Sequence, residues 1–114
     1  NSNLLANDLA KNVNISQDLQ NHIANLVIKD DKGKQFSLKD LPKKPYIIHG
    51  WASWCAPCIV ELPELNEFYQ KYKYNYNIIP VILADNKSND QIKILLKRIS
   101  ASNLPIYREN QNFQ

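Results

Sequence analysis

Trp51-Ala-Ser-Trp-Cys-Ala-Pro-Cys58 contains both cysteines of this 114-residue chain, with two residues between them. As a structural crosslink the pair would contribute little, because stabilisation by a disulfide grows with the length of the loop that it closes. As a zinc site it lacks two ligands, since the only histidines, His22 and His49, do not stand at a familiar ligand spacing from it. The spacing therefore favours a redox-active pair.

The flanking sequence predicts that the cysteines lie where a strand ends and a helix begins. Residues 46–49, Tyr-Ile-Ile-His, are typical of a short buried strand. From Cys58 to Tyr72, apolar residues three and four apart predict a helix, which Pro63 should kink. Unpaired N–H groups and the dipole at a helix N-terminus favour an anion. We therefore expect Cys55 to ionise more readily than a free cysteine, whose pKa is about 8.5.

The spacing of the two cysteines also suggests how they divide the work. Cys55 would form a mixed disulfide with a partner, and Cys58, about one turn later, would attack that disulfide and release the partner. Pro57 between them suits the first turn of a helix, where its missing N–H costs no hydrogen bond. We expect Trp54 to line the site and keep water from the sulfur, and Trp51 to be a core aromatic residue.

Glu61 is the acidic residue best placed to help the cysteines. It follows Cys58 by three residues, so it shares the same helix face, where we expect it to be partly buried. A carboxyl group there could shuttle the proton that Cys58 loses before it attacks. An exposed helix glutamate is the alternative for Glu61, and it is what we expect of Glu64 and Glu67.

The rest of the chain predicts an α/β fold. Alternating apolar residues around a turn at residues 30–33 indicate a β-hairpin, and residues 78–84 are apolar on both faces, as in a central parallel strand. Pro80 is awkward there, because it cannot donate to a neighbour. Ser88 and Gln91 match a capping box at the start of a second helix. Strand, helix, strand and helix in succession predict a right-handed parallel crossover.

Composition bounds the domain organisation. The net charge is only +3 and no run of lysines exceeds two, which indicates a solvated surface rather than one that binds nucleic acid. No apolar stretch reaches the roughly 20 residues of a membrane span; since residue 1 is Asn, we expect that a signal peptide or anchor has been removed. We predict a helical lead-in over residues 1–24 and one domain over residues 25–114.

From residue 26 to about residue 108 the chain resembles the TlpA-type thioredoxin-like proteins, extracytoplasmic reductases that include the cytochrome c maturation proteins. The resemblance is carried by Phe36-Ser-Leu-Lys-Asp-Leu41, by the cysteine motif and by Glu61-Leu-Pro-Glu-Leu65. It implies a thioredoxin fold, periplasmic or membrane-anchored residence, and a reversible Cys55–Cys58 couple with no other cofactor. It also implies that Cys55 is the attacking thiol, Cys58 the resolving thiol and Glu61 the acid kept beside them.

Two residues before the motif depart from that family. His49 stands where the family usually has Asn or a similar residue, and Gly50 replaces a common aromatic residue. We expect both departures to loosen the packing under the motif. We expect His49 to be a hydrogen-bonded strand histidine rather than a proton relay.

Thioredoxin-like proteins also have a cis-proline that faces the cysteines at the start of a substrate-binding strand. The only candidate is Pro105, in Asn103-Leu-Pro-Ile-Tyr107. A similar segment precedes the cis-proline in TlpA-type proteins, so we interpret Pro105 as that earlier segment and expect the chain to stop before the cis-proline, the last strands and the final helix. The active-site strand would then lack a neighbour. We expect the chain to borrow a partner's strand, to form a strand-exchanged dimer, or to be a remnant with weakened substrate binding.

The function predicted from these residues is thiol–disulfide exchange, most simply the reduction of protein disulfides with electrons from an upstream thiol reductant. An oxidising role, or service as the electron-donor module of a larger reductase, is the near alternative, because similar motifs span potentials from about −270 to −120 mV. A truncated binding module with little activity is an alternative of another class, and metal carriage is a third. We expect the partners to be proteins and not nucleic acids. We expect any membrane anchor to lie outside this chain.

Overall fold

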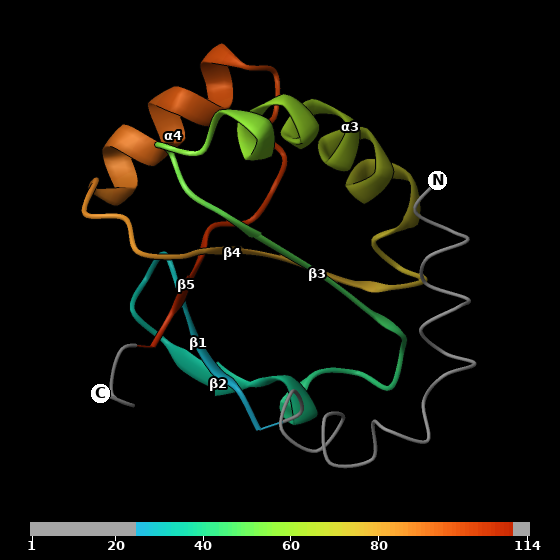
Figure 1. Cartoon of the computed structure of the whole chain (residues 1–114). Helices are drawn as coiled ribbons and strands as arrows, with labels where there is room; N and C mark the ends of the chain where they lie inside the picture. Colours follow the sequence, from blue (N-terminus) through green and yellow to red (C-terminus); the bar gives the residue numbers. More distant parts are fainter. Residues whose placement is uncertain (1–24, 111–114) are drawn as a thin grey trace.

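The structure, a computed structural model, describes residues 25–110. Within that range the elements are, in chain order, β1 (Val27–Asp30), β2 (Gln35–Ser37), the short 3-10 helix η2 (Leu38–Asp40), β3 (Tyr46–Trp51), α3 (Ala56–Tyr72), β4 (Asn77–Ile82), α4 (Asn89–Arg98) and β5 (Tyr107–Glu109). They form a five-stranded sheet in the order β2-β1-β5-β4-β3 (Figure 1). The predicted α/β class is confirmed, whereas the predicted lead-in, residues 1–24, lies outside the described residues.

The β-hairpin is encoded by its turn. β1 and β2 pair antiparallel, with Ile28 opposite Phe36. The side chain of Asp30 accepts hydrogen bonds from the N–H groups of Lys32 and Lys34, both at 2.9 Å. Gly33 has a φ of +84°, a backbone conformation that residues with a side chain rarely adopt. The predicted hairpin is therefore confirmed, with its turn at the expected residues.

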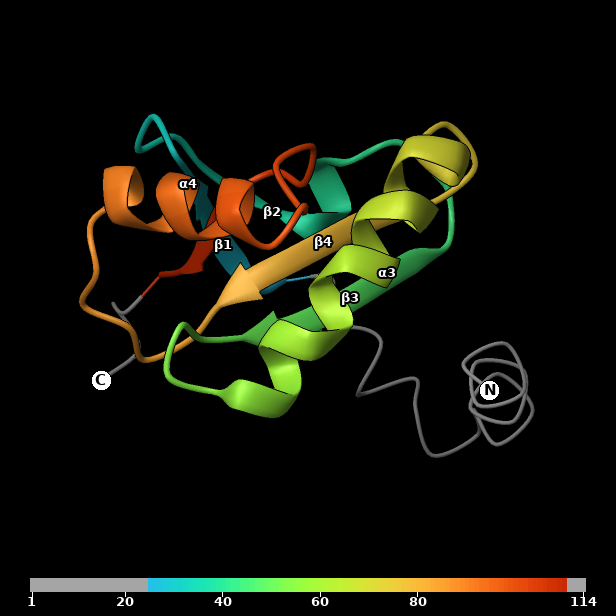
Figure 2. The ribbon, with the colours of Figure 1, turned by 90° about the horizontal axis from the view of Figure 1, so that it is seen from above.

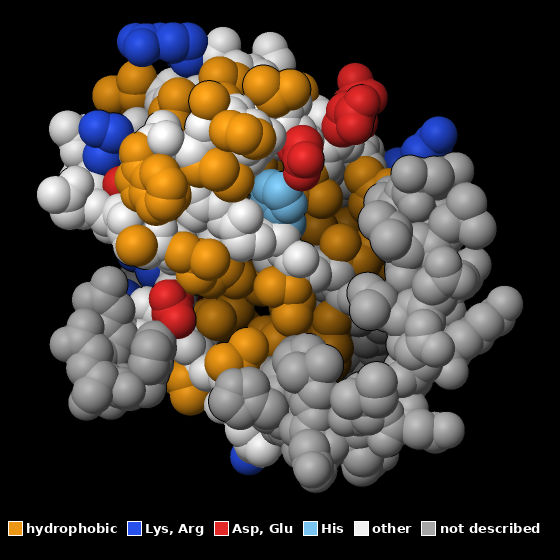
Figure 3. All heavy atoms as spheres, viewed as in Figure 1, with side chains coloured by type: hydrophobic (Ala, Val, Ile, Leu, Met, Phe, Trp, Pro, Cys, Tyr) orange, Lys and Arg blue, Asp and Glu red, His pale blue; other side chains and the backbone are white. Residues whose placement is uncertain are grey.

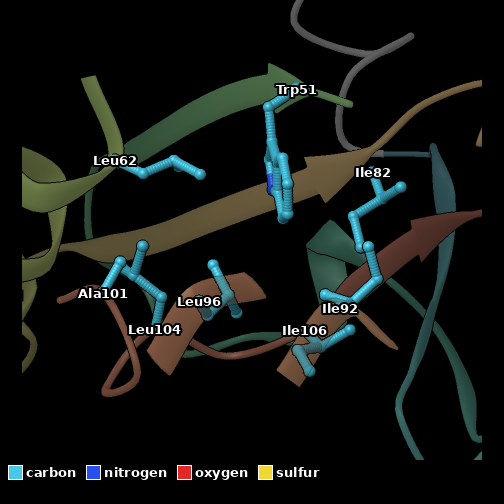
Figure 4. Close-up of a cluster of buried hydrophobic side chains, with 8 residues drawn as sticks. All are labelled: Trp51, Leu62, Ile82, Ile92, Leu96, Ala101, Leu104 and Ile106. Carbon is cyan, nitrogen blue, oxygen red and sulfur yellow. The ribbon is translucent and has the colours of Figure 1, made fainter. Parts of the chain in front are cut away.

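Two parallel crossovers build the rest of the sheet. β3 and β4 are parallel, with Trp51 opposite Ile82, and β4 and β5 are parallel as well. The connecting helices α3 and α4 cover the same face of the sheet, as the two perpendicular views show (Figures 1 and 2). Their buried side chains meet those of the strands in one hydrophobic cluster, drawn in Figure 4: Trp51, Leu62, Ile82, Ile92, Leu96, Ala101, Leu104 and Ile106.

β4 is an interior strand, parallel to β3 and β5 on its two sides, and all six of its residues are buried, as the apolar sequence predicts. Pro80 fits because of the direction in which its nitrogen points. The N–H groups of Asn77 and Leu83 donate to Pro45 and Trp51, on the β3 side. Directions alternate along a strand, so the Pro80 nitrogen points to the β5 side, where pairing begins only with Val81. The proline therefore removes no hydrogen bond of the ladder.

β3 is a strand as predicted, but it is not buried. It lies at an edge of the sheet formed by the described residues, paired with β4 on one side. On the face opposite the helices, the side chains of Tyr46 and Ile48 are exposed, Ile48 by 42%. A second buried cluster lies on that face and includes no residue of β3. Its members are Ile28, Leu38, Ile79 and Val81. The strand's apolar sequence therefore reflects one covered face rather than two.

Candidate active site

Cys55 and Cys58 lie at the junction of β3 and α3 and are joined by a disulfide, with 5.3 Å between their Cα atoms. Cys55 is the N-cap of α3 and has extended backbone angles. Its N–H donates to the carbonyl of Ala52 at 3.0 Å, which holds the approach to the helix in a turn. Both cysteines are half-buried. The predicted placement of the pair at the start of a helix is confirmed.

The first turn of α3 is well suited to hold a negative charge on Cys55. The N–H of Ile59 donates to the Cys55 carbonyl at 3.0 Å, so the earlier helical N–H groups have no partner within the helix. Pro57, inside the first turn as predicted, has no N–H, which leaves those of Ala56 and Cys58. No acidic residue stands in this turn. These N–H groups and the helix dipole therefore favour a thiolate.

The two tryptophans of the motif have different environments. Trp51 is only 3% exposed and belongs to the core cluster, so its predicted core role is confirmed. Trp54 is 70% exposed, and its indole Nε1 donates to the carbonyl of Ala84 at 2.9 Å. The hydrogen bond fixes one edge of the ring while its faces stay open. The prediction that Trp54 shields the sulfur from water stays a prediction.

Asp85 supports the loop that leads into the cysteines. Its carboxylate accepts hydrogen bonds from the N–H of Ser53 at 2.6 Å and from the N–H of Lys87 at 3.1 Å. Burial opposes the charge of this carboxyl group, but the hydrogen bonds from Ser53 and Lys87 and the nearby charge of Arg108 outweigh it and lower the pKa of Asp85 below its ordinary value. A carboxylate on the loop after β4 thus anchors the loop after β3.

Arg108, from β5, holds the Asp85 loop in turn. Its guanidinium donates to the carbonyls of Asp85, at 3.1 Å, and Lys87, and to the side-chain oxygen of Asn89 at 3.0 Å. The prediction from sequence missed both Asp85 and Arg108. The one signal available for Asp85 was its place just after a predicted parallel strand, since the carboxyl ends of such strands meet at one edge of the sheet.

Glu61 and His49 form a pair between α3 and β3. His49 Nδ1 lies 3.8 Å from Glu61 Oε2. The Glu61 side chain is 66% exposed, so the expectation that it is partly buried is wrong, although it does lie beside a titratable group. His49 Nε2 is buried and has no hydrogen-bond partner among the described residues, so the expectation of a fully hydrogen-bonded histidine is wrong too. Glu64 and Glu67 are exposed, as predicted.

A histidine is visible at the surface, beside acidic and hydrophobic side chains (Figure 3).

Gly50, the other residue that departs from the family pattern, is covered by the side chain of Leu83. A Cβ placed at Gly50 would lie 2.8 Å from Leu83 Cδ1, so the leucine side chain fills the place that a larger residue would take. The packing is therefore not loosened at Gly50 in the way we expected.

Pro105 lies apart from the cysteine motif. It precedes the amino end of β5, whereas the cysteines follow the carboxyl end of β3; because the strands are parallel through β4, these ends point to opposite edges of the sheet. All peptide bonds of the described residues are trans. Pro105 lines a cavity together with Leu96 and Tyr107, and burial raises the pKa of the Tyr107 hydroxyl. The substrate-binding role of Pro105 stays a prediction.

Residues 25–110 contain neither a metal-binding cluster of side chains nor a helix that could span a membrane. No three His, Cys, Asp or Glu side chains there gather into a group that could hold a metal ion. No helix in the same range has the length and apolar character needed to cross a membrane.

Comparison with known proteins adds the family. Residues 19–107 match the model of the AhpC/TSA family. The thiol-disulfide oxidoreductase ResA of Bacillus thuringiensis (strain Al Hakam) is 47% identical over 49 residues, which is 43% of this chain and 28% of the relative. The sporulation thiol-disulfide oxidoreductase A of Bacillus subtilis (strain 168) is 31% identical over 67 residues, 58% of this chain and 40% of the relative. The chain thus spans well under half the length of these relatives.

Solved structures show the same fold. A secreted disulfide oxidoreductase of Mycobacterium tuberculosis, homologous to DsbE of E. coli, superposes with a TM-score of 0.60 at 15% identity, covering 76% of this chain and 62% of that one. The exposed lipoprotein thioredoxin Etrx1 of Streptococcus pneumoniae superposes with a TM-score of 0.59 at 25% identity, covering 77% and 67%. The predicted thioredoxin-like fold is therefore confirmed.

Proposed function

Since the chain belongs to the AhpC/TSA family, we propose that it is a TlpA-type thiol–disulfide oxidoreductase that reduces protein disulfides through Cys55 and Cys58. The observation that carries the proposal is the disulfide at the N-terminus of α3, with unpaired N–H groups and no acidic residue in the first turn. The relatives named as thiol-disulfide oxidoreductases support it.

The exchange proceeds in two thiol–disulfide steps. In the reduced protein, the Cys55 thiolate attacks one sulfur of the substrate disulfide; a bond forms between Cys55 and that sulfur, and the other substrate sulfur leaves as a thiolate and takes a proton. Cys58 then loses its proton and attacks the Cys55 sulfur, which releases the second substrate thiolate. Two electrons have passed from the dithiol to the substrate. A thiol reductant returns the Cys55–Cys58 disulfide to the reduced form.

Apolar side chains around the disulfide suit a protein substrate. Trp54 is 70% exposed, and Ala56 and Pro57, which lie between the cysteines in sequence, are exposed at the start of the helix. An extended substrate segment laid over this rim would remove apolar surface from water at the site of attack. The proposed substrate is therefore a disulfide within a polypeptide rather than a small disulfide.

We place the protein outside the cytoplasm, in the periplasm or attached to a membrane by an anchor outside this chain, with the Cys55–Cys58 disulfide as its only redox group. The pneumococcal neighbour at 25% identity is named an exposed lipoprotein, which supports this location. We also propose a role in cytochrome c biogenesis, which is supported by the resemblance of the motif to the TlpA-type reductases.

The test is to trap the intermediate. The Cys58→Ser chain should form a stable mixed disulfide with a disulfide-containing peptide, visible as a single adduct by intact mass, because the resolving thiol is gone. The wild-type chain should reduce insulin disulfides in the presence of dithiothreitol well above the rate of the reductant alone, and Cys55→Ser should abolish the effect. If the wild type and Cys55→Ser are equally slow and no adduct forms, the chain is a binding module and the proposal fails.

A further inference from the structure

The imidazole of His49 lies between β3 and α3, the two elements that meet at the cysteine motif. His49 and Trp51 point to the helix-covered face of β3, where Glu61 of α3 approaches the Nδ1 atom. The opposite ring nitrogen, Nε2, is buried and has no hydrogen-bond partner within residues 25–110. A buried polar atom without a partner is uncommon in a folded protein and calls for a cause.

Cys58 lies one helical turn from the carboxylate that meets His49. Residues three apart on a helix have Cβ atoms about 5–6 Å from each other, so Glu61 and Cys58 share one face of α3. Cys58 also packs against the cluster that contains Trp51 and Leu62. In this oxidised form the Cys58 sulfur is held in the disulfide and has no proton to donate. A reduced Cys58 would bring a thiol proton into the neighbourhood of the unpartnered nitrogen.

Among the described residues, the side chains that share the His49 face of β3 and β4 carry no charge. Its register partner on β4 is Pro80, flanked on the same face by Ile78 and Ile82. On β3 itself the residues of that face are Ile47 and Trp51. The titratable residues on the facing stretch of α3 are Glu61, whose Oε2 lies 3.8 Å from His49 Nδ1, and Cys58, three residues earlier on the same helix face. A histidine that contacts this carboxylate, one helical turn from Cys58, is suited to pass a proton between a half-buried thiol and an exposed carboxylate.

We propose that His49 takes up the proton that Cys58 loses when it resolves the mixed disulfide, and that Glu61 links this histidine to solvent. The proposal rests on the proposed function. Histidine changes its charge near neutral pH, which suits it to accept and return a proton under these conditions.

The step balances as follows. With the substrate attached to Cys55, neutral His49 accepts the thiol proton of Cys58 and becomes an imidazolium ion, and the Cys58 thiolate forms a bond to the Cys55 sulfur. The bond between Cys55 and the substrate sulfur breaks, and the substrate leaves as a thiolate. The imidazolium then returns its proton through Glu61 and water, and the released thiolate is protonated.

The resolving step is measured apart from the first attack. A limiting amount of dithiobis-nitrobenzoate added to the reduced chain releases one thionitrobenzoate when Cys55 attacks and a second when Cys58 resolves the adduct. The first phase reports the proposed function, and the second reports the proton transfer. At about pH 6.5, His49→Gln should slow the second phase roughly hundredfold, the lower end of general-base effects, and leave the first phase within about twofold.

The pH profile distinguishes a proton acceptor from a packing residue. Above about pH 9 the thiol ionises without help, so the wild type and His49→Gln should converge there. Glu61→Gln should slow the second phase less than His49→Gln, and His22→Gln is the matched control at the other histidine. If the first phase is absent in the wild type, the proposed function fails; if it is present and the second phase of His49→Gln matches the wild type at every pH, His49 has no such role.

A measurement on a chain that keeps His49 covers the case in which His49→Gln does not fold. In the His22→Gln chain the single remaining histidine ring signal belongs to His49 and is followed by NMR titration. Its midpoint should differ between the oxidised and reduced chains, because Cys58 carries a thiol proton only in the reduced chain. Identical midpoints in both redox states would overturn the proposal.

Discussion

At Cys55 the helix starts with a sulfur where most helices place an oxygen. Ser, Thr, Asp and Asn are preferred at this position because their side chains accept hydrogen bonds from the first-turn N–H groups. Cys55 makes no such hydrogen bond in the disulfide form. A thiolate released by reduction would face the free N–H groups of Ala56 and Cys58 and complete the cap. The missing side-chain hydrogen bond at the N-cap therefore favours the Cys55 thiolate, which is the reactive form.

The hydrogen-bonded carboxylate of Asp85 leads to a prediction about stability and pH. Its lowered pKa means that the carboxylate stabilises the folded state at pH values above 3.8, the ordinary pKa of the group. This stabilisation is lost as the pH falls through the lower pKa of the folded state. Asp85→Asn should lower the free energy of unfolding at pH 7 by about 1 kcal/mol, discounted for exposure. The difference from the wild type should vanish in strong acid, as measured by urea unfolding between pH 2 and 7. A difference that does not change with pH would contradict the assignment.

At the scale of elements, α4 is specified by its own first turn. Ser88 accepts a hydrogen bond from the N–H of Gln91 at 3.2 Å, and the Gln91 side chain accepts one from the N–H of Ser88 at 2.9 Å. The capping box predicted from sequence is confirmed. The stripe that it starts, with Ile92 and Leu96 buried, packs against α3 and the sheet. α4 is thus a scaffold element, remote in chain order from the cysteines.

Removal of that cap should affect stability without affecting the chemistry. Ser88→Ala should lower the free energy of unfolding by about 1 kcal/mol, the usual effect of losing an N-cap. The rate at which Cys55 attacks dithiobis-nitrobenzoate should stay within about twofold, because the motif is positioned by α3 and the Asp85 loop. Ser102→Ala, at an exposed serine, is the control for both measurements. A large fall in reactivity of Ser88→Ala would mean that α4 positions the site.

For the whole molecule, the exposed edge of β3 is the feature with the clearest consequence. One side of β3 has no strand beside it among the described residues, and Ile48 is exposed on the uncovered face. Edge strands with apolar side chains tend to pair with other chains. We expect this chain to self-associate through β3, either by strand pairing or by strand exchange.

The self-association is open to direct measurement. Sedimentation velocity should show a concentration-dependent dimer for the 114-residue chain, and Ile48→Lys should shift it to monomer, because a charge on an edge strand opposes pairing. Val60→Lys, at an exposed apolar position on α3, is the matched control and should leave the dimer unchanged. A wild type that stays monomeric throughout would contradict the expectation.

Features set by neighbouring residues could be read from the sequence. The hairpin turn at Asp30–Gly33, the capping box at Ser88 and the start of α3 at Cys55 each depend on residues within four positions of one another, so their chemistry is visible in a short window. The order of strands and helices then restricts the topology to a parallel crossover. Fold class and cysteine pair both follow from this local information.

Contacts between distant residues had to come from packing. Ser53 meets Asp85 from 32 positions away, and Arg108 meets Asp85 from 23 positions away. His49 meets Glu61 only because α3 folds back over β3. Periodicity tells which face of an element is apolar, but it does not tell which polar groups of two packed elements come within reach of each other. The reactive pair is therefore encoded in eight consecutive residues, while the groups that hold and serve it are brought together by the fold.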